Sequence, residues 1–243
     1  MTLLILGGNS DVAHAVALQF AARAGADITL ASRDMELLKK KTADIEIRHN
    51  TTARAVHFDA ADPESHVAFY DRLSPKPDVV VAAFGYLGDQ ARAQSEGEEA
   101  RRIIDTNFTG AVSILEIVAA DLEARKKGVI IGIGSVAGLR GRQSNYIYGA
   151  AKGALGIYLS GLRNRLSKHG VHVITVLPGF IDTKMTAGMG LPGLLTATAQ
   201  QAAEDIFEAY RKSRNTIYTR WFWRWIMVVI RSIPEGIFKR LSL

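Results

Sequence analysis

Uninterrupted apolar runs alternate with longer amphipathic stretches along almost the whole chain. Runs of this kind, without a polar residue at every second position, are typical of strands that are buried on both faces of a sheet. We expect strands at residues 2–6, 27–33, 53–59, 78–85, 128–135, 171–179 and 215–219. The first of these is followed by a tight glycine turn at Gly7 and Gly8.

The stretches between the strands have the apolar spacing of helices that cover a core. They predict helices at residues 12–25, 34–45, 63–73, 98–126, 148–169 and 199–213, and an irregular segment at 183–198. Because strands and helices alternate, we predict an α/β fold with one doubly wound parallel sheet of the Rossmann type and helices on both faces.

Composition limits the class of protein. Of the 243 residues, 48% are hydrophobic and 22% charged, which is enough to build a core without disorder. There is no cysteine, so disulfides and thiolate chemistry are excluded, and we predict a cytoplasmic protein. The N-terminus reaches glycine too early for a signal peptide, and no run approaches the roughly 18 apolar residues that span a membrane.

Charge separates the chain into two parts. We predict a catalytic domain at 1–219 and a basic aromatic tail at 220–243, with no linker or internal repeat. The tail has five basic residues and one acidic residue, so it contributes +4 of the net charge of +6 and leaves +2 for the rest. This distribution argues against a nucleic-acid partner and points to a local role for the tail.

The first candidate for chemistry is a tyrosine and a lysine four residues apart, Tyr148 and Lys152, with Ser135 upstream. On a helix these two side chains lie on one face. A neighbouring ammonium lowers the pKa of a phenol from about 10 toward neutrality, so Tyr148 would exchange a proton near pH 7. The alternative is an ordinary surface pair.

The second candidate is a nucleotide site at the carboxyl ends of the strands. In a doubly wound sheet the glycine turn at 7–13 would meet a diphosphate there, at a helix N-terminus. Ser32 stands where an acid would bind the ribose of NAD(H), and Arg33 suits a 2′-phosphate. We therefore predict NADP(H) over NAD(H). The alternative is that Arg33 is a solvated charge.

Further residues follow in a fixed order, and together the set resembles the short-chain dehydrogenase/reductase family over nearly the whole chain. Beside the glycine turn, the set comprises Asp59, Asn107, Ser135, Tyr148, Lys152, Pro178, Gly179 and Thr183. The resemblance implies an enzyme that transfers a hydride between a nicotinamide cofactor and a carbonyl or secondary alcohol.

The resemblance also implies a role for each residue. Tyr148 would protonate the carbonyl oxygen, and Lys152 would lower the pKa of Tyr148 and bind the nicotinamide ribose. Ser135 would hold the substrate oxygen, and Asn107 would anchor a water that connects Lys152 with solvent. The implied cofactor site comprises Gly7, Asn9, Ser10, Asp11, Val12, Ser32, Arg33, Asp59, Ala60, Ala83, Phe84, Gly85, Tyr148, Lys152, Pro178, Gly179, Ile181 and Thr183. No metal site is predicted.

The sequence departs from the family pattern at two places. Asp11 and Ala13 replace the second and third glycines of the turn. We expect the Asp11 carboxylate to turn away from the diphosphate and cap its own helix; the alternative is altered cofactor binding. The segment 82–85 keeps only the last residue of Asn-Asn-Ala-Gly, and Phe84 brings a bulky side chain toward the adenosine.

Residues 184–200 occupy the position of the family's substrate loop. Glycines make this segment mobile, and it carries the apolar side chains of Met185, Met189, Leu191, Leu194 and Leu195. We expect a lid over an apolar substrate. Core packing of a flexible loop is the alternative.

The tail carries all three tryptophans, at 221, 223 and 225, and we expect Arg220, Arg224 and Arg231 to share one helical face. Such a segment suits an interfacial helix on an anionic membrane, which would place the protein peripherally at the inner face. A subunit interface and a cap over the active site are the alternatives.

With the glycine turn, the tail is similar to that of decaprenylphosphoryl 2-keto-pentose reductases. This similarity implies an apolar or lipid-linked sugar substrate. Family resemblance implies a homodimer or homotetramer through the helices at 98–126 and 148–169. The rival hypothesis is a non-catalytic dinucleotide-binding regulator or scaffold at the membrane surface.

Overall fold

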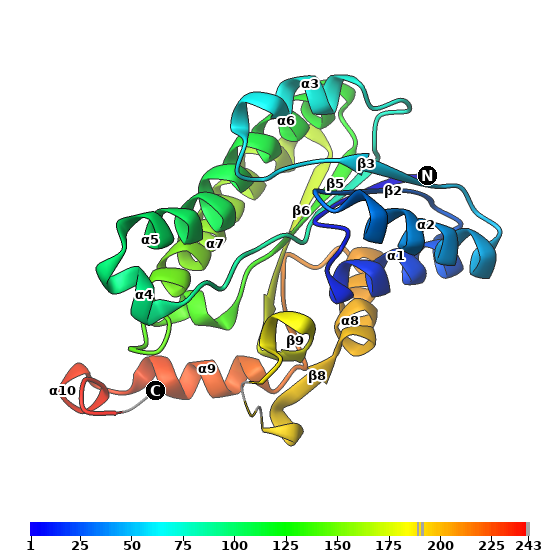
Figure 1. Ribbon diagram of the computed structural model, residues 1–243. Coiled ribbons are helices and arrows are strands. Elements are labelled where there is room, and N and C mark those ends of the chain that lie inside the picture. The colour runs from blue at the N-terminus through cyan, green and yellow to red at the C-terminus, as the bar shows by residue number, and fades with distance from the viewer. Residues whose placement is uncertain (189, 191, 242–243) are drawn as a thin grey trace.

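The computed structural model describes residues 1–188, 190 and 192–241 (Figure 1). Seven strands form one sheet in the order β3-β2-β1-β4-β5-β6-β9, and every neighbouring pair is parallel. The predicted doubly wound sheet is therefore confirmed. The strands are β1 (Thr2–Leu6), β2 (Asp27–Ser32), β3 (Ala53–His57), β4 (Val79–Ala82), β5 (Gly128–Ile133), β6 (Val171–Pro178) and β9 (Thr216–Thr219).

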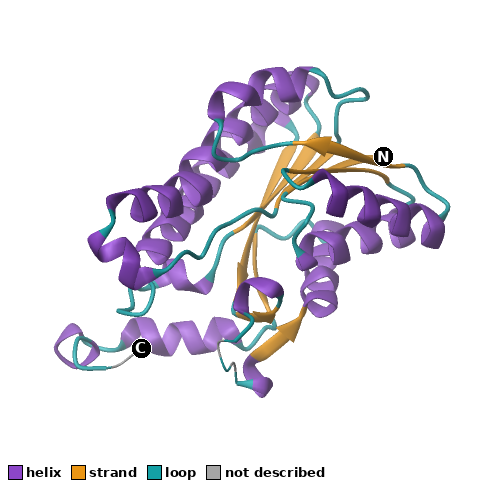
Figure 2. Cartoon of the chain, in the orientation of Figure 1, coloured by secondary structure: helices purple, strands orange, loops and turns teal. Residues whose placement is uncertain are grey.

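Helices cover both faces of this sheet (Figure 2). The strand side chains alternate between the faces, so that Leu3 and Ile5 join one apolar cluster and Leu4 and Leu6 the other. The helices are α1 (Asp11–Ala24), α2 (Met35–His49), α3 (His66–Asp71), α4 (Gln90–Ser95), α5 (Gly97–Ile104), α6 (Gly110–Arg125), α7 (Tyr146–Leu166), α8 (Ala199–Arg211), α9 (Trp223–Ser232) and α10 (Glu235–Phe238).

The helix predicted at 98–126 is not regular. A π-helical turn, Asp105–Thr109, separates α5 from α6. Gly110 follows it, and a Cβ there would lie 1.8 Å from the carbonyl oxygen of Ala60. The chain thus needs glycine where this helix passes the segment after β3, and the π turn places Asn107 in the buried interior.

The combined run Gly97–Arg125 is long and apolar enough to cross a membrane by length and composition. Several of its apolar side chains, among them Ile114, Leu115 and Val118, are fully buried against the sheet, in the cluster that contains Leu4 and Leu6, whereas Ile104 is 42% exposed. That packing is typical of a core helix, so the run is weak evidence for a membrane span.

The segment predicted as irregular contains a second, two-stranded parallel sheet. β7 (Phe180–Asp182) pairs with β8 (Thr196–Thr198), and two short 3-10 turns, η5 (Lys184–Thr186) and η6 (Gly193–Leu195), lie between them. The predicted lid is therefore fixed at both ends. Two of its predicted apolar residues, Met189 and Leu191, lie outside the described residues.

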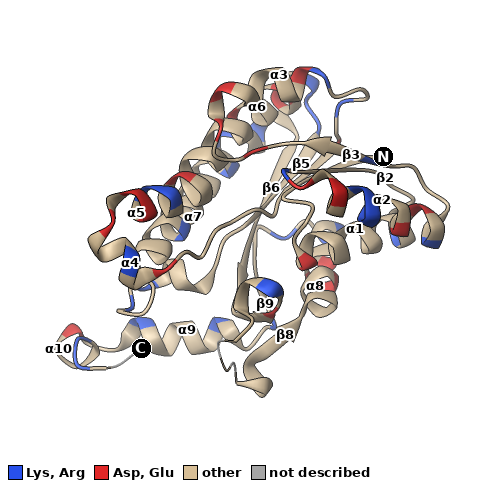
Figure 3. Cartoon of the chain, in the orientation of Figure 1, with Lys and Arg blue, Asp and Glu red and all other residues tan. Residues whose placement is uncertain are grey.

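The tail lies beyond the carboxyl ends of β6 and β9, along one edge of the molecule (Figure 1). The expected single face of three arginines is wrong for Arg220, because this residue precedes α9 and has a left-handed φ of 60°. Trp223 and Met227 point inward, 3% and 1% exposed, and pack with Val136 and Leu177. Figure 3 shows basic positions along α9 and around α10.

Candidate active site

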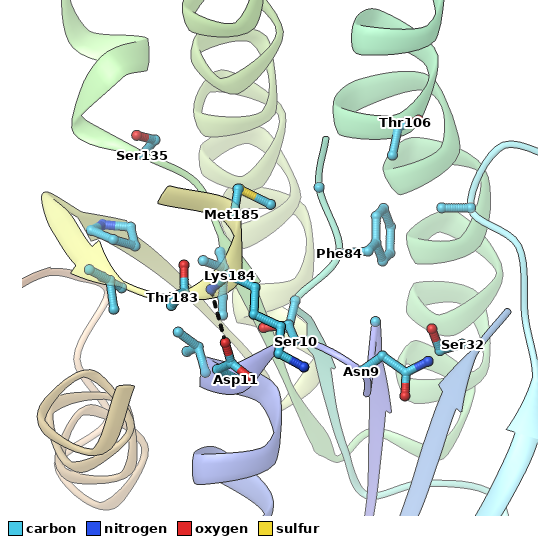
Figure 4. A pocket seen from close by; sticks show the side chains of 18 of the residues that line it. Asn9, Ser10, Asp11, Ser32, Phe84, Thr106, Ser135, Thr183, Lys184 and Met185 are labelled. Carbon is cyan, nitrogen blue, oxygen red and sulfur yellow. Dashed lines mark hydrogen bonds between the residues drawn. The ribbon is translucent and has the colours of Figure 1, made fainter. Parts of the chain in front are cut away.

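A cavity of about 390 Å³ lies where the carboxyl ends of the strands meet (Figure 4). Every residue of the predicted cofactor set lines this cavity, from Gly7 in the first turn to Thr183 after β7. Of the four predicted catalytic residues, Ser135, Tyr148 and Lys152 line it and Asn107 does not. The sheet therefore brings together side chains that are more than a hundred residues apart in the sequence.

The glycine turn fits closely against the neighbouring strand end. Gly7 has a φ of 86°, and a Cβ on it would lie 2.6 Å from the backbone nitrogen of Phe84. Ser10 caps α1 by accepting a hydrogen bond from the Ala13 amide at 3.2 Å. The turn thus presents a helix N-terminus to the cavity, which favours an anionic group such as a diphosphate.

Asn9 supplies a second observation that fits a bound dinucleotide. Its Nδ2 donates to the carbonyl oxygen of Asp34 at 2.8 Å. Its Oδ1 is buried at the cavity wall and has no hydrogen-bond partner among the described residues. Because buried polar atoms are normally paired, this acceptor suits a donor group on a ligand.

Asp11 does not cap its own helix as predicted, because Ser10 already fills that role. Its Oδ2 instead accepts a hydrogen bond from the Lys184 amide at 3.1 Å, as Figure 4 shows. Its Oδ1 lies 4.0 Å from Nζ of Lys41, which also donates to the carbonyl oxygen of Ser10 at 3.2 Å. The carboxylate thus joins the glycine turn to the start of the lid.

The adenosine end of the predicted site is formed by aromatic and backbone groups. The rings of Phe58 and Phe84 lie 5.7 Å apart between centroids, and both residues line the cavity. Asp59 accepts from the Ala61 amide at 2.9 Å with one carboxylate oxygen. Its carbonyl oxygen lies 2.9 Å from Nε2 of the fully buried His66. These contacts fix the backbone that follows β3.

Tyr148 and Lys152 project from the first two turns of α7, as predicted. Nζ of Lys152 lies 5.9 Å from the centre of the Tyr148 ring and donates to the carbonyl oxygen of Ile133 at 3.0 Å. The lysine is only 4% exposed. Burial lowers the pKa of its ammonium to about 8, so the group still carries its charge at pH 7.

The predicted direction of the Tyr148 pKa is wrong for the protein without cofactor. Burial raises the pKa of Tyr148 to about 12, and a hydrogen bond with Ser135 opposes this rise only in part. A phenolate in an apolar surrounding loses its hydration, and here that loss has the larger effect. The phenol of Tyr148 is therefore neutral across the physiological pH range.

Ser135 and Asn107 are both held by backbone groups. The Ser135 hydroxyl oxygen accepts a hydrogen bond from the Ala137 amide at 3.1 Å, which leaves its own proton free to point elsewhere. The Asn107 amide donates to the carbonyl oxygens of Tyr86 and Ile103 at 2.6 and 2.8 Å and accepts from the Tyr86 amide. The Asn107 side chain thus fixes the loop after β4.

Other residues of the cavity wall were not predicted as site residues. They are Phe58, Thr106, Ile133, Gly134, Lys184, Met185 and Thr186. Ile133 lies two positions before Ser135, and each of the others is a direct sequence neighbour of a predicted residue or lies in the predicted lid. A site prediction extended by one position on either side of each predicted residue would have included Phe58, Thr106, Gly134 and Lys184.

A parallel sheet with a glycine turn after its first strand, and a half-buried tyrosine and a buried lysine that line the same cavity as that turn, define a dinucleotide-dependent oxidoreductase. Residues 1–191 match the family model for short chain dehydrogenase, and the chain belongs to that family. An uncharacterized oxidoreductase of Streptomyces coelicolor is 35% identical over 243 residues, 99% of this chain and 95% of the relative. An uncharacterized oxidoreductase of Mycobacterium tuberculosis is 32% identical over 242 residues, which are 98% of this chain and 96% of the relative.

Solved structures share the fold. A short-chain dehydrogenase from Sphingobium yanoikuyae in complex with NADPH superposes with a TM-score of 0.84, at 22% identity, over 99% of this chain and 96% of that one. A short-chain dehydrogenase from Burkholderia cenocepacia in complex with NADP superposes with a TM-score of 0.82 at 19% identity, over 100% of this chain and 97% of that one.

The buried ammonium predicts a stability effect. Lys152→Met should raise the free energy of unfolding by about 1–3 kcal/mol at pH 7, because it removes a charge buried with one hydrogen bond. The folded pKa of Lys152, about 8, is below the unfolded value of 10.5. The penalty is therefore complete below pH 8, and the gap between variant and wild type should shrink as pH rises from 8 to 10.5.

Urea unfolding at pH 7 and pH 10 measures this gap, with Lys168→Met as the exposed control, for which no change is expected. A variant that is less stable than the wild type at pH 7, or a gap that widens with pH, contradicts the assignment of Lys152 as a destabilising buried charge.

Proposed function

We propose that the protein is an NADP(H)-dependent carbonyl reductase, or alcohol dehydrogenase in the reverse direction. The observation that carries this proposal is the convergence of Ser135, Tyr148 and Lys152 on the cavity that the glycine turn also lines. A non-catalytic binder needs the turn but has no need of a proton donor and a buried ammonium at the other end.

The side chains divide the proton chemistry among them. A bound nicotinamide supplies or accepts the hydride. Tyr148, neutral below its pKa of about 12, donates its proton to the substrate oxygen in reduction. Ser135 donates to the same oxygen with the proton that its contact to Ala137 leaves free. The Lys152 ammonium then stabilises the phenolate as it forms.

The cofactor is held, in this proposal, by the glycine turn at the diphosphate, Asp59 and Ala60 at the adenine, and Ile181 and Thr183 at the nicotinamide end. Asn107 acts through the loop after β4, whose backbone it fixes. In this proposal Asn107 also anchors a water molecule beside Lys152.

Tyr148→Phe should lower turnover by about 10²–10⁴-fold, the usual effect of removing a general acid. NADPH affinity should stay unchanged, since the phenyl ring fills the same space. A panel of carbonyl substrates, including lipid-linked sugars, followed by NADPH absorbance gives the measurement. Tyr146→Phe, in the partly exposed neighbour at the start of α7, is the matched control.

Turnover in Tyr148→Phe close to that of wild type would rule out this role. A wild-type protein that binds NADPH but reduces nothing in the panel would favour the non-catalytic scaffold, and a protein that binds neither NADPH nor NADH would defeat both hypotheses.

The preference for NADP(H) rests on Ser32 and Arg33 at the end of β2, both of which line the cavity. Arg33 is exposed, so its guanidinium is free to approach a phosphate. Two of the structures with the same fold carry NADPH or NADP. Ser32 carries no carboxylate for the ribose, unlike the acid that NAD(H) enzymes use at this strand end. The nearby Asp34 caps α2 by accepting a hydrogen bond from the Leu37 amide at 3.0 Å, and it does not line the cavity.

Arg33→Ala should weaken NADPH binding by about 10- to 100-fold, the value of one or two charge-assisted hydrogen bonds. NADH binding should change little, because NADH lacks the 2′-phosphate. Fluorescence titration with both cofactors measures this, with Arg72→Ala, an exposed arginine outside the cavity lining, as control. An equal loss for NADPH and NADH would show that Arg33 does not read the phosphate.

We further propose that the tail, 220–243, contacts an anionic membrane beside the catalytic domain, 1–219. Trp225 and Val229 on the outer face of α9 are 59% and 63% exposed, and Leu194 on the adjoining lid is 92% exposed. Arg224 and Arg231 lie among them as exposed cations. Aromatic and apolar side chains interspersed with arginine suit an interface with anionic lipid.

A membrane at this face would lie next to the substrate end of the cavity, which supports an apolar or lipid-linked carbonyl as substrate. Trp223 joins the two regions, because its Nε1 donates to the carbonyl oxygen of Leu195 at 3.1 Å. We also keep a homodimer or homotetramer through α5, α6 and α7 as part of the proposal, with the site on the inner face of the membrane.

Wild-type protein should sediment with vesicles that contain phosphatidylglycerol and much less with phosphatidylcholine alone, and added salt should weaken binding. The double variant Trp225→Glu/Val229→Glu should lose this binding and remain folded, since both side chains point outward. Ile47→Glu, 85% exposed on α2 and outside the proposed subunit interface, is the control that should keep it. Failure of the wild type to bind, together with dissociation of an oligomer by the double variant, would instead make this face a subunit interface.

A further inference from the structure

The two ends of α9 contact two segments that adjoin the cavity, the lid and the loop that follows β5. At its N-terminal end the Trp223 ring lies on Gly179, where a Cβ would be 1.9 Å from the indole, and its Nε1 holds Leu195 of the lid. At its C-terminal end α9 meets Arg140, which lies just after the turn that begins at Ser135. The tail therefore bridges the lid and the loop that follows β5.

Arg140 binds the end of α9 with most of its donors. Its Nη1 donates to the carbonyl oxygens of Ile230, Arg231 and Ile233 at 3.1, 2.9 and 2.8 Å. Its Nη2 donates to Oε2 of Glu235 at 3.0 Å, and its guanidinium lies 3.9 Å from the centre of the Phe238 ring. A cation at this place satisfies carbonyls that a helix end leaves unpaired and opposes the negative end of the helix dipole.

The loop between Ser135 and Arg140 packs closely against α7. It forms a 3-10 turn, η3 (Val136–Leu139), that Ser135 caps. A Cβ on Gly138 would lie 2.5 Å from the backbone nitrogen of Gly153. A Cβ on Gly149 would lie 2.8 Å from the carbonyl oxygen of Ala137. The turn thus rests directly on the backbone of α7, at the residues that follow Tyr148 and Lys152.

We propose that Arg140 is a positioning residue, and that through it α9 acts as a brace that sets the distance of Ser135 from Tyr148 and Lys152. The chain of contacts runs from α9 through Arg140 to η3, and from η3 to Ser135 and α7. Arg140 does not line the cavity, so its effect is on geometry alone. A displacement of about 1 Å at a reacting group can cost 10²-fold in rate. This role goes beyond the proposed function, because it assigns the tail a task that needs no membrane.

Steady-state kinetics of Arg140→Met is the first test, with the full chain. We expect kcat to fall about 10- to 100-fold, with NADPH affinity unchanged because the glycine turn is remote from η3. Arg140→Lys should recover part of kcat, since a cation still reaches the carbonyls. Glu235→Gln and Arg231→Met are the controls: each removes one tail charge, keeps the three carbonyl contacts, and should leave kcat near that of wild type.

Amide hydrogen exchange is the second test, and it does not depend on finding a substrate. In Arg140→Met, exchange should rise in the tail, in residues 134–141 and in the first turns of α7, and stay unchanged in β1, α1 and β2. A rise confined to the tail with kcat retained would overturn the proposal. A uniform rise throughout the chain would show that Arg140 only stabilises the fold, and would overturn it equally. If wild type reduces no substrate in the panel, the proposed function fails, while the exchange pattern still decides the role of Arg140.

Discussion

The burial of the Lys152 ammonium is the constraint on which the site depends. This ammonium donates a hydrogen bond to the carbonyl oxygen of Ile133, because the end of β5 passes beside α7. A charge held this way destabilises the fold, and its pKa falls for that reason. The same surrounding raises the pKa of Tyr148. Burial thus disfavours the charged form of both groups, whose side chains lie 5.9 Å apart from Nζ to ring centre. In the proposed reaction, the Lys152 ammonium would stabilise the Tyr148 phenolate as it forms.

Glycines allow the loops at the strand ends to lie close to Lys152, to Asn107 and to one another. A Cβ on Gly85 would lie 2.9 Å from Oδ1 of Asn107 and 3.3 Å from Nζ of Lys152, and one on Gly138 would strike Gly153. Backbone therefore lies against backbone or against functional side chains at the strand ends. The contacts of backbone with backbone, such as that of Gly138 with Gly153, cannot relax by a change of rotamer, so a shift in one loop is passed to the next. This is the physical reason that a residue outside the cavity, such as Arg140, is able to influence the geometry within it.

The sheet could be predicted because a strand that is buried on both faces appears in the sequence as an unbroken apolar run between polar turns, such as 79–82. The set of residues around the cavity was predicted from the family resemblance, and these residues converge because parallel strands place all their carboxyl ends at one edge. Contacts between residues that are far apart in the sequence could not be predicted. Asp11 bonds the amide of Lys184, 173 positions away, and the π turn at Asn107 depends on contact between Gly110 and Ala60. The pKa of Tyr148 was predicted in the wrong direction because helical spacing gives the distance to Lys152 but not the burial.

The tail shows how one amphipathic helix can serve two purposes without conflict. Trp223 and Met227, four residues apart, face the body, whereas Trp225 and Val229, also four apart, face away. The inner pair packs with Val136 and Leu177, next to the loop that carries Ser135, and the outer pair is free of the fold. Contact of the outer face with lipid would therefore involve residues that do not pack against the core, and it would place no requirement on the type of residue at the inner face. The proposed membrane contact on the outer face of α9 and the proposed brace through Arg140 are connected only by the helix itself. A membrane that binds the outer face would therefore also affect the position of Arg140 and, through it, the geometry of the site.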